Sequence, residues 1–373
     1  AIALGMMLRY LRRGDRKSAL LAGLWLGIGL YGYNAFKVVP LIVPAAVLLA
    51  LFDPRWRERR GRLIADGLLI AATALLLFLP LFQFMLGSPE EFFFRALTRA
   101  TSLERPLPGP PAAVFLSNLK NMLLAFHWRG DHSWIDTVTG EPFLDPVGGG
   151  LLLAGAMVAL VRAIRGSRRW TLVLISIPIL TLASTLSLAF PIENPGTNRA
   201  AVAAPSIFVL AALPAAWLVT ESRKREFRMR LAVGFSLGAM AAVSLQQNFE
   251  SYFVRYEKQQ ARLLPPVMDV VRVMKDYRAR GVPFENVYLL DTMYWIDGRC
   301  IGFEIGDLSW SDIHRVAPDE PVPPILDRPL LFIVHPNDEE RRLQLKERFP
   351  QGEERLVPQR FRDRDYDVYY VPR

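Results

Sequence analysis

The segment Ser18–Phe52 most constrains how this chain can fold. It contains two apolar runs, Ala19–Ala35 and Val38–Phe52, with Lys37 between them. An amphipathic helix of a soluble protein would show a polar face about every 3.6 residues, and neither run shows one. Each run is close to the shortest helix that crosses a bilayer core of roughly 30 Å at about 1.5 Å per residue. The sequence therefore predicts a transmembrane hairpin.

Basic residues mark the far ends of this hairpin and of later apolar runs. Their clusters are Arg12, Arg13, Arg16 and Lys17; Arg55, Arg57, Arg59, Arg60 and Arg62; Arg162, Arg165, Arg168 and Arg169; and Arg223, Lys224, Arg225, Arg228 and Arg230. Such clusters are typical of cytoplasmic loops that face lipid headgroups, so the hairpin tip is predicted to lie outside. The formal net charge of +9 then follows from membrane topology, and no nucleic-acid partner is predicted.

Residues 1–245 are predicted to form a transmembrane helical domain with a large outer loop at 87–149. After the hairpin, the expected spans are Leu63–Leu86, Leu151–Ile164, Thr171–Phe190, Ala200–Val219 and Leu231–Leu245. Two segments of the outer loop, beginning at Ser88 and at Ala112, are predicted to be surface helices. The chain opens without an initiating Met inside what looks like the end of a helix, so we expect the domain to lack its N-terminal spans.

Residues 246–373 are predicted to form a small α/β domain outside the membrane, because the number of crossings is odd. Helices are expected on both sides of Pro265-Pro266 and after Pro336. Strands are expected at Asn286–Asp291, around Gly302–Ile305, at Leu330–His335 and in the last twenty residues. The single cysteine, Cys300, excludes an intramolecular disulfide and a cysteine cluster for zinc.

Polar residues at the predicted outer boundary are the candidate site. At the hairpin tip, Lys37 follows Tyr31, Tyr33 and Asn34. Its ammonium group could hold a lipid-linked phosphate with the help of these phenol and amide groups, or it could simply extend toward lipid headgroups. Both interpretations remain open from the sequence.

Three arginines extend this candidate site. Arg95 and Arg99 lie one helical turn apart and share a face, so they could clamp a phosphate or lie among headgroups. Arg199 begins a predicted span and follows Asn198, close to Glu193. It could bind phosphate, or it could belong to a charge-paired cluster at the outer surface.

The outer loop also contains a histidine-aspartate cluster. His127, Asp131 and His132 could bind a metal ion, but a hydrogen-bonded loop is the favoured interpretation, and no metal ligand or certain cofactor is predicted beyond a possible divalent cation. Asp131, Asp136, Glu141 and Asp145 include candidates for a general base. The sequence contains no Walker loop, nucleophile elbow or Rossmann glycine pattern, which disfavours nucleotide chemistry and an energised pump.

The hairpin sequence GLWLGIGLYGYNAFKVVPL resembles the G-x-x-x-G-x-G-x-Y-x-Y-x-x-x-[RK]-x-x-P pattern of bacterial members of glycosyltransferase family 39. These enzymes are similar to protein O-mannosyltransferases and to the lipid A aminoarabinose transferase. The segments PEEFFFRA, NLKNMLLAFHWRGD, GEPFLDPVGGGLLLAG and ENPGTNRAAVAAPSIFVLAA also resemble that family's outer loop and following spans. The resemblance covers roughly Ala1–Tyr256.

The resemblance implies a GT-C fold in the plasma or inner membrane. It implies transfer of a sugar from a polyprenyl-phosphate donor to a lipid, glycan or protein acceptor on the extracytoplasmic face. In the family, a catalytic aspartate lies in the first outer loop, which would precede Ala1, so the catalytic residue is unknown here and this fragment alone is expected to be inactive. Lys37 stands where an arginine is frequent and lacks the bidentate fork.

The chemistry of the candidate residues predicts their roles in such a transfer. Donor phosphate binding falls to Lys37, Arg95 and Arg199, and the substrate cavity is formed by Tyr31, Tyr33, Asn34, His127, Asp131, His132 and Asn198. A non-enzymatic transporter or envelope-assembly scaffold is the alternative. Transporters tend to contain inverted repeats, and we find no matching pair of segments. A buried charged residue inside a span would favour transport, and within the predicted spans only Asp66, near a cytoplasmic end, is a candidate.

Overall fold

The computed structural model describes residues 1–292, 295–317, 320–322, 329–359 and 365–372. It is mostly helical, with a small sheet near the C-terminus. The chain divides into two compact units, a first unit at Ala1–Glu257 and a second unit at Lys258–Arg373.

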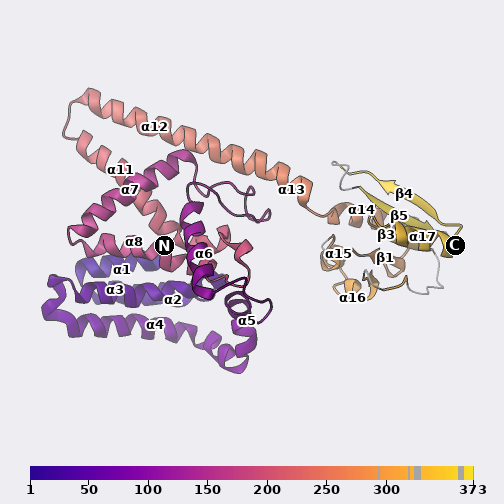
Figure 1. Ribbon diagram of the computed structural model, residues 1–373, viewed down its shortest axis with the longest axis horizontal. Coiled ribbons are helices and arrows are strands. Elements are labelled where there is room, and N and C mark those ends of the chain that lie inside the picture. Colours follow the sequence, from indigo (N-terminus) through magenta and orange to yellow (C-terminus); the bar gives the residue numbers. More distant parts are fainter. Residues whose placement is uncertain (293–294, 318–319, 323–328, 360–364, 373) are drawn as a thin grey trace. The chain divides into compact units, whose positions relative to one another are not determined.

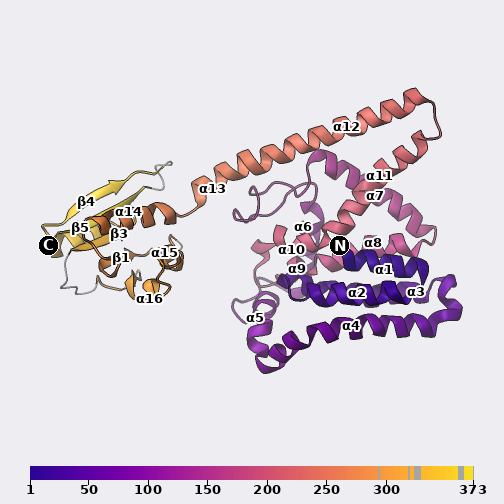
Figure 2. The same ribbon diagram turned by 180° about the vertical axis from the view of Figure 1, so that it is seen from behind.

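Helices make up the regular structure described in the first unit (Figure 1). They are α1 (Ile2–Arg13), α2 (Arg16–Gly29), η1 (Asn34–Leu41), α3 (Ile42–Leu51), η2 (Pro54–Arg59), α4 (Arg60–Gly87), α5 (Pro89–Ala100), α6 (Pro111–Ala125), α7 (Pro146–Ile164), α8 (Arg168–Leu180), α9 (Leu182–Thr185), η3 (Pro191–Glu193), α10 (Thr197–Ala200), η4 (Ala201–Ala203), α11 (Ala204–Ser222), α12 (Phe227–Glu250) and η5 (Ser251–Tyr256). The two views in Figure 1 and Figure 2 agree that α1, α2 and α3 lie side by side.

Within the described residues, five helical segments are long and apolar enough to cross a membrane. They are Asn34–Leu51, Pro54–Gly87, Pro146–Ile164, Thr197–Ser222 and Phe227–Leu263. Neither run of the predicted hairpin forms one long α-helix, although the second run lies almost entirely within the segment Asn34–Leu51. The first apolar run becomes α2, which has 14 residues and ends at Gly29, and the second run starts as the 3-10 helix η1 before α3 begins.

The prediction of one continuous span at Thr171–Phe190 is wrong. Helix α8 ends at Leu180, two residues after Pro178, and only the four-residue α9 follows. Proline interrupts the helical hydrogen bonds, and carbonyl groups at a helix end need other donors. Asn118 of α6 supplies a donor at the end of α9, because its Nδ2 donates to the carbonyl of Thr185 at 3.1 Å and also to that of Ser187 at 3.2 Å.

Small residues bring helices of the first unit together. Gly23 and Gly27 lie four apart on α2, and a Cβ at Gly23 would lie 2.6 Å from the carbonyl oxygen of Ile70 on α4. Gly155 of α7 makes a similar contact with Leu210 of α11. Such close backbone approach is the usual basis of helix packing in membranes.

A buried carboxylate connects three segments of the first unit. Asp66 of α4 is 1% exposed, accepts a hydrogen bond from the Tyr10 hydroxyl at 3.1 Å, and forms ion pairs with Arg16 at 3.2 Å and Arg62 at 3.5 Å. The buried charged residue inside the predicted spans is therefore paired with its neighbours, which gives it a structural role.

We expect Asp66→Ala to lower the free energy of unfolding by about 2 kcal/mol, because the buried Tyr10 hydroxyl loses its acceptor, whereas the largely exposed Arg16 and Arg62 remain hydrated. Thermal unfolding of the detergent-solubilised chain measures this effect. Glu58→Ala is the control, since Glu58 is an exposed carboxylate of η2. Equal losses in the two variants would contradict the structural role.

The second unit contains a five-stranded mixed sheet. Its elements are α13 (Glu257–Leu263), α14 (Val267–Ala279), η6 (Phe284–Asn286), β1 (Val287–Leu290), α15 (Gly298–Ile305), α16 (Trp310–His314), β2 (Arg315–Val316), β3 (Leu330–Val334), α17 (Glu339–Arg348), β4 (Glu353–Val357) and β5 (Tyr366–Val371). The strand order is β2-β1-β3-β5-β4; β1 is parallel to β2 and β3, and β5 is antiparallel to β3 and β4.

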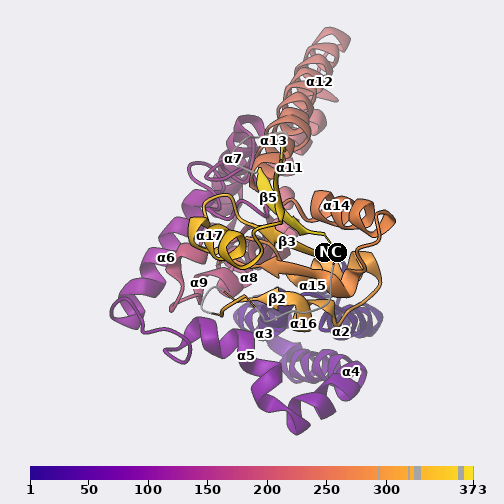
Figure 3. The same ribbon diagram turned by 90° about the vertical axis from the view of Figure 1, so that its right-hand side faces the viewer.

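Helices cover both faces of this sheet. Figure 3 shows α14 and α17 on opposite sides of it. Residues of α14, α15 and α16 pack with Leu289 and Ile333 in one apolar cluster, whereas Leu345 of α17 packs with Leu290 and Phe332 in the other. The alternation of neighbouring residues between two clusters is the pattern of a sheet buried on both sides.

The strand predicted around Gly302–Ile305 is wrong, because these residues belong to helix α15. Asp297 caps its start by accepting from the amide of Arg299 at 3.0 Å, and Gly306 ends it with a positive φ of 80°. A side-chain cap and a left-handed glycine are strong helix signals. The strand beside β1 is instead β2.

His314 of α16 is a buried histidine of the second unit. It is 7% exposed, packs against the rings of Trp310 and Tyr288, and its Nδ1 has no hydrogen-bond partner in the described part of the chain. Burial lowers its pKa below 6.5, and the carboxylates of Asp307 and Glu285 oppose this shift. The folded unit therefore favours the neutral ring.

We expect the stability of the second unit to be fully present above pH 6.5 and to fall as the pH decreases below it, since the unfolded chain then binds a proton that the folded chain resists. Pulse proteolysis of the full chain in urea between pH 5 and 8 measures this dependence. His314→Phe should reduce the slope. A slope unchanged in the variant would show that another group is responsible.

Candidate functional site

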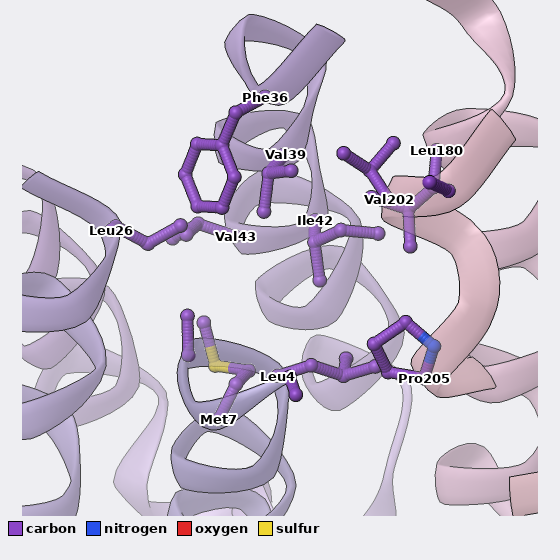
Figure 4. A pocket seen from close by; sticks show the side chains of 13 residues that line it. Leu4, Met7, Leu26, Phe36, Val39, Ile42, Val43, Leu180, Val202 and Pro205 are labelled. Atoms are coloured by element: carbon purple, nitrogen blue, oxygen red, sulfur yellow. The ribbon is translucent and has the colours of Figure 1, made fainter. Parts of the chain in front are cut away.

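Helix η1 separates two cavities of different chemistry. On one side, Phe36 and Val39 line an apolar cavity of about 180 Å³. Figure 4 shows their side chains with Ile42 and Val43 of α3, Leu4 and Met7 of α1, Leu26 of α2, and Leu180, Val202 and Pro205 from the opposite wall. The labelled side chains are hydrocarbon or thioether, so this cavity suits an apolar ligand.

On the other side of η1 lies a basic cavity of about 450 Å³. Its wall contains Tyr33, Asn34, Ala35, Lys37, Val38, Phe92, Arg95, Ala96, Arg99, Ala100, Ala183, Leu186 and Arg199. Four of these residues are cations, and the lining includes no carboxylate. The cations come from η1, α5 and α10, which are distant in the sequence.

Lys37 is half-buried where η1 meets α5. Its Nζ donates to the carbonyl of Phe92 at 3.4 Å and lies 3.8 Å from the centre of the Phe92 ring. An ammonium group over an aromatic face is held electrostatically and keeps donors for a further acceptor. Lys37 thus points into the protein at the basic cavity, which disfavours its interpretation as a free headgroup anchor.

Glu193 holds two arginines of the basic cavity together. Its carboxylate pairs with Arg99 at 3.1 Å and with Arg199, and Arg99 also pairs with Glu104 at 2.8 Å. The charge-paired cluster considered for Arg199 therefore exists. Four cations less two carboxylates still leave two positive charges in excess around the cavity.

An acidic cavity of about 350 Å³ adjoins the basic one, because Arg199 lines both. Its wall contains Asp131, His132, Ser133, Asp136, Ile192, Glu193, Gly196, Asn198 and Arg199. Asp131 is 2% exposed and organises the loop: its carboxylate accepts from the amides of Ser133 at 2.8 Å and Thr197 at 2.7 Å. Both oxygens of Asp131 are thus occupied.

Asp136 is the more available carboxylate of the acidic cavity. Burial raises its pKa above the usual value and the negative charge of Asp131 adds to this, while Arg199 and a hydrogen bond from Ser133 act in the opposite direction. Asn198 lies at the hydrogen-bond limit from it, at 3.5 Å. A carboxylate with a raised pKa beside a cavity has the properties of a proton acceptor.

Asp136 also lines an aromatic cavity of about 820 Å³. Its wall includes His127, Trp128, Glu141, Asp145, Gln247, Asn248, Tyr252, Arg255 and Tyr256. The rings of Tyr252 and Tyr256 stack at 5.7 Å and 16°, and Trp128 is 80% exposed. Asp145 fixes this wall by accepting from Ser244 and Asn248 of α12 at 2.8 and 2.9 Å.

The structure brings most of the predicted site residues to these adjoining cavities. Lys37, Arg95, Arg199, Tyr33 and Asn34 line the basic cavity, and Asp131, His132 and Asn198 line the acidic one. Two residues differ. The Tyr31 hydroxyl donates to the carbonyl of Leu77 at 2.8 Å, and the His127 ring bonds the carbonyl of Gly149 at 3.0 Å in the aromatic cavity.

The hydrogen bond of His127 to Gly149 means that its ring does not form a cluster with Asp131 and His132. In the part of the chain that the structure describes, no group of three or more His, Cys, Asp or Glu residues could hold a metal ion.

The sequence did not predict the contact of Phe92 with Lys37 or the aromatic residues that η5 contributes to a cavity wall. A helix carrying Tyr252 and Tyr256 four residues apart was the available signal, since residues at this spacing share a face.

The chain was compared with known families, curated proteins and solved structures, and none of them matches.

Proposed function

We propose that this chain is part of an integral membrane glycosyltransferase of the GT-C type. It would move a sugar from a polyprenyl-phosphate donor to an acceptor on the extracytoplasmic face. The observation that carries this proposal is the position of η1, which places Lys37 at a basic cavity and Phe36 and Val39 at an apolar one. A ligand with a phosphate joined to a hydrocarbon chain fits this combination.

The positive charge of the basic cavity would favour the transfer of the sugar as well as the binding of the lipid-phosphate donor. A sugar joined to a lipid phosphate carries one negative charge, and the lipid phosphate that leaves carries up to two. Lys37, Arg95 and Arg199 would therefore interact more strongly with the leaving group than with the donor, which lowers the barrier to transfer. Arg199 would place this phosphate next to the acidic cavity.

The acidic and aromatic cavities would receive the sugar and the acceptor. Asp136 lines both, so an acceptor hydroxyl or amine that enters past Tyr252 and Tyr256 would meet a carboxylate close to the donor. The raised pKa of Asp136 supports a contribution to acceptor binding.

The arrangement of the basic links supports the proposed sidedness. Arg62 Nη2 donates to the carbonyl of Gly14 at 2.9 Å, and Arg168 Nη2 to that of Phe52 at 3.4 Å. The arginine-rich links after α1, α3 and α7 thus meet at one end of the first unit. We infer that this end is cytoplasmic and that the basic and acidic cavities, lined by other loops, are outside.

Binding of undecaprenyl phosphate to the purified full chain tests the proposal. We expect it to bind at least about tenfold more tightly than undecaprenol or inorganic phosphate, because one lacks the anion and the other lacks the hydrocarbon chain. Microscale thermophoresis in detergent measures the three affinities. If undecaprenyl phosphate and undecaprenol bound with equal affinity, the basic cavity would not be the phosphate site, and the proposal would fail.

A further inference from the structure

A fifth cavity, here called the arginine cavity, has a volume of about 630 Å³. It is lined by Leu8, Arg9, Arg12, Arg13, Arg162, Arg169, Trp170, Val173 and Val209, from α1, α7, α8 and α11. Five guanidinium groups and four apolar side chains thus share one wall, and none of the lining residues is acidic. This wall differs from the basic cavity in its residues and in its elements.

The five arginines reach the cavity from three separate segments. Arg9, Arg12 and Arg13 share one face of α1, because they lie three and four positions apart. Arg162 is in the last turn of α7 and Arg169 in the first turn of α8. None of the five forms an ion pair within the described ranges of the chain.

The acidic residue that follows α1, Asp15, lies close enough to Arg9 and Arg13 to interact with their charges, but it offsets at most one of the five. Both oxygens of Asp15 accept from the Ser18 hydroxyl at 2.9 Å, and the Ser18 amide donates to the same carboxylate at 2.8 Å. Asp15 therefore caps α2. The arginine cavity keeps a large excess of positive charge.

The stability of the helices explains the positions of only some of the five arginines. Arginines in the last turn of a helix, such as Arg12, Arg13 and Arg162, interact favourably with the helix dipole. Arg169 does the reverse, because it adds positive charge to the positive end of α8, where an anion would be favourable. The guanidinium of Arg162 lies 5.4 Å from the Trp170 ring, which holds it against the wall.

We propose that the arginine cavity binds the headgroup of an anionic membrane phospholipid that carries two phosphodiester groups. Guanidinium groups match phosphate oxygens as bidentate donors. Five such groups exceed what one singly charged phosphodiester needs, and basic pockets between membrane helices at the cytoplasmic side favour headgroups of this kind. Leu8, Val173 and Val209 would contact the acyl chains, which favours a lipid over a free anion.

This inference does not depend on the proposed glycosyl transfer, because it uses other residues and another ligand. Binding of cardiolipin to the full chain in detergent, measured by native mass spectrometry, tests it. We expect cardiolipin to bind at least about tenfold more tightly than phosphatidylglycerol, and phosphatidylcholine to bind weakly. Pyrophosphate at millimolar concentration should not displace cardiolipin. Equal binding of phosphatidylcholine, or displacement by pyrophosphate, would overturn the proposal.

Two matched triple variants locate the site. Arg12→Gln/Arg13→Gln/Arg169→Gln should weaken cardiolipin binding at least about tenfold. Arg57→Gln/Arg59→Gln/Arg60→Gln removes the same charge from exposed positions of another link and should change binding less than about twofold. Equal losses would show that only overall charge matters. If the variant Arg12→Gln/Arg13→Gln/Arg169→Gln does not fold, the lipid selectivity and the pyrophosphate competition measured on the unchanged chain still test the proposal.

Discussion

Lys37→Met will weaken the binding of undecaprenyl phosphate by about thirtyfold or more. The ammonium is half-buried, and Phe92 holds it by a backbone carbonyl and by its ring face. A charged hydrogen-bond donor of this kind contributes about 2 kcal/mol or more to a phosphate contact, and each step of about 1.4 kcal/mol is a factor of ten in affinity. Methionine keeps the length and the apolar contacts of the side chain.

Two further substitutions at and near this position separate charge from structure. Lys37→Arg should retain binding, because arginine keeps the charge and adds a bidentate fork. Lys120→Met is the control, since Lys120 is an exposed lysine of α6 outside the basic cavity. If Lys120→Met and Lys37→Met lost the same affinity, Lys37 would have no specific role.

The same experiment should reveal a coupling between Lys37 and Arg199. If both contact one phosphate, the double variant Lys37→Met/Arg199→Gln will lose less affinity than the two single variants added together, because the second loss acts on a ligand that is already displaced. Arg129→Gln, at an exposed position, should combine additively with Lys37→Met. If the losses of affinity in Lys37→Met and Arg199→Gln were strictly additive, Lys37 and Arg199 would not contact the same phosphate.

The sequence predicted best those features that depend on local residues. Tyr33, Asn34 and Lys37 lie within five positions, so they share the end of one hairpin and line one cavity. For Arg95 and Arg199, the sequence predicted only that both are candidate phosphate-binding residues on the outer side of the membrane. Their place in the same cavity depends on how α5 and α10 pack against η1, which the periodicity of single segments does not encode.

The sequence predictions that failed concern helix ends and short apolar runs. An apolar run such as Thr171–Phe190 has no period that shows where the helix stops, and the contact from Asn118 that stabilises its end comes from another helix. The four residues Gly302–Ile305 were too few to distinguish a strand from a helix. The cap at Asp297 and the glycine at 306 were the local signals that favoured the helix.

Gly155→Ala will destabilise the first unit by forcing α7 and α11 apart. A Cβ at this position would lie 1.8 Å from the carbonyl oxygen of Leu210 on α11. Both atoms belong to backbone or are fixed to it, so no side-chain rotation relieves the clash and α7 must move away from α11. We expect a loss of about 3 kcal/mol in the free energy of unfolding, at the upper end for overpacking.

Gly150→Ala provides the matched control in the same helix. A Cβ at Gly150 would have no neighbour within 4 Å, and alanine is a better helix former than glycine by about 1 kcal/mol. This variant should therefore be neutral or slightly more stable in thermal unfolding in detergent. Because Arg199 lies at the start of the segment that continues into α11, Gly155→Ala should also weaken undecaprenyl phosphate binding, whereas Gly150→Ala should not. If both variants unfolded at the temperature of the unchanged chain, the close approach of α7 and α11 would be wrong, and with it the wall that holds Arg199 beside Lys37.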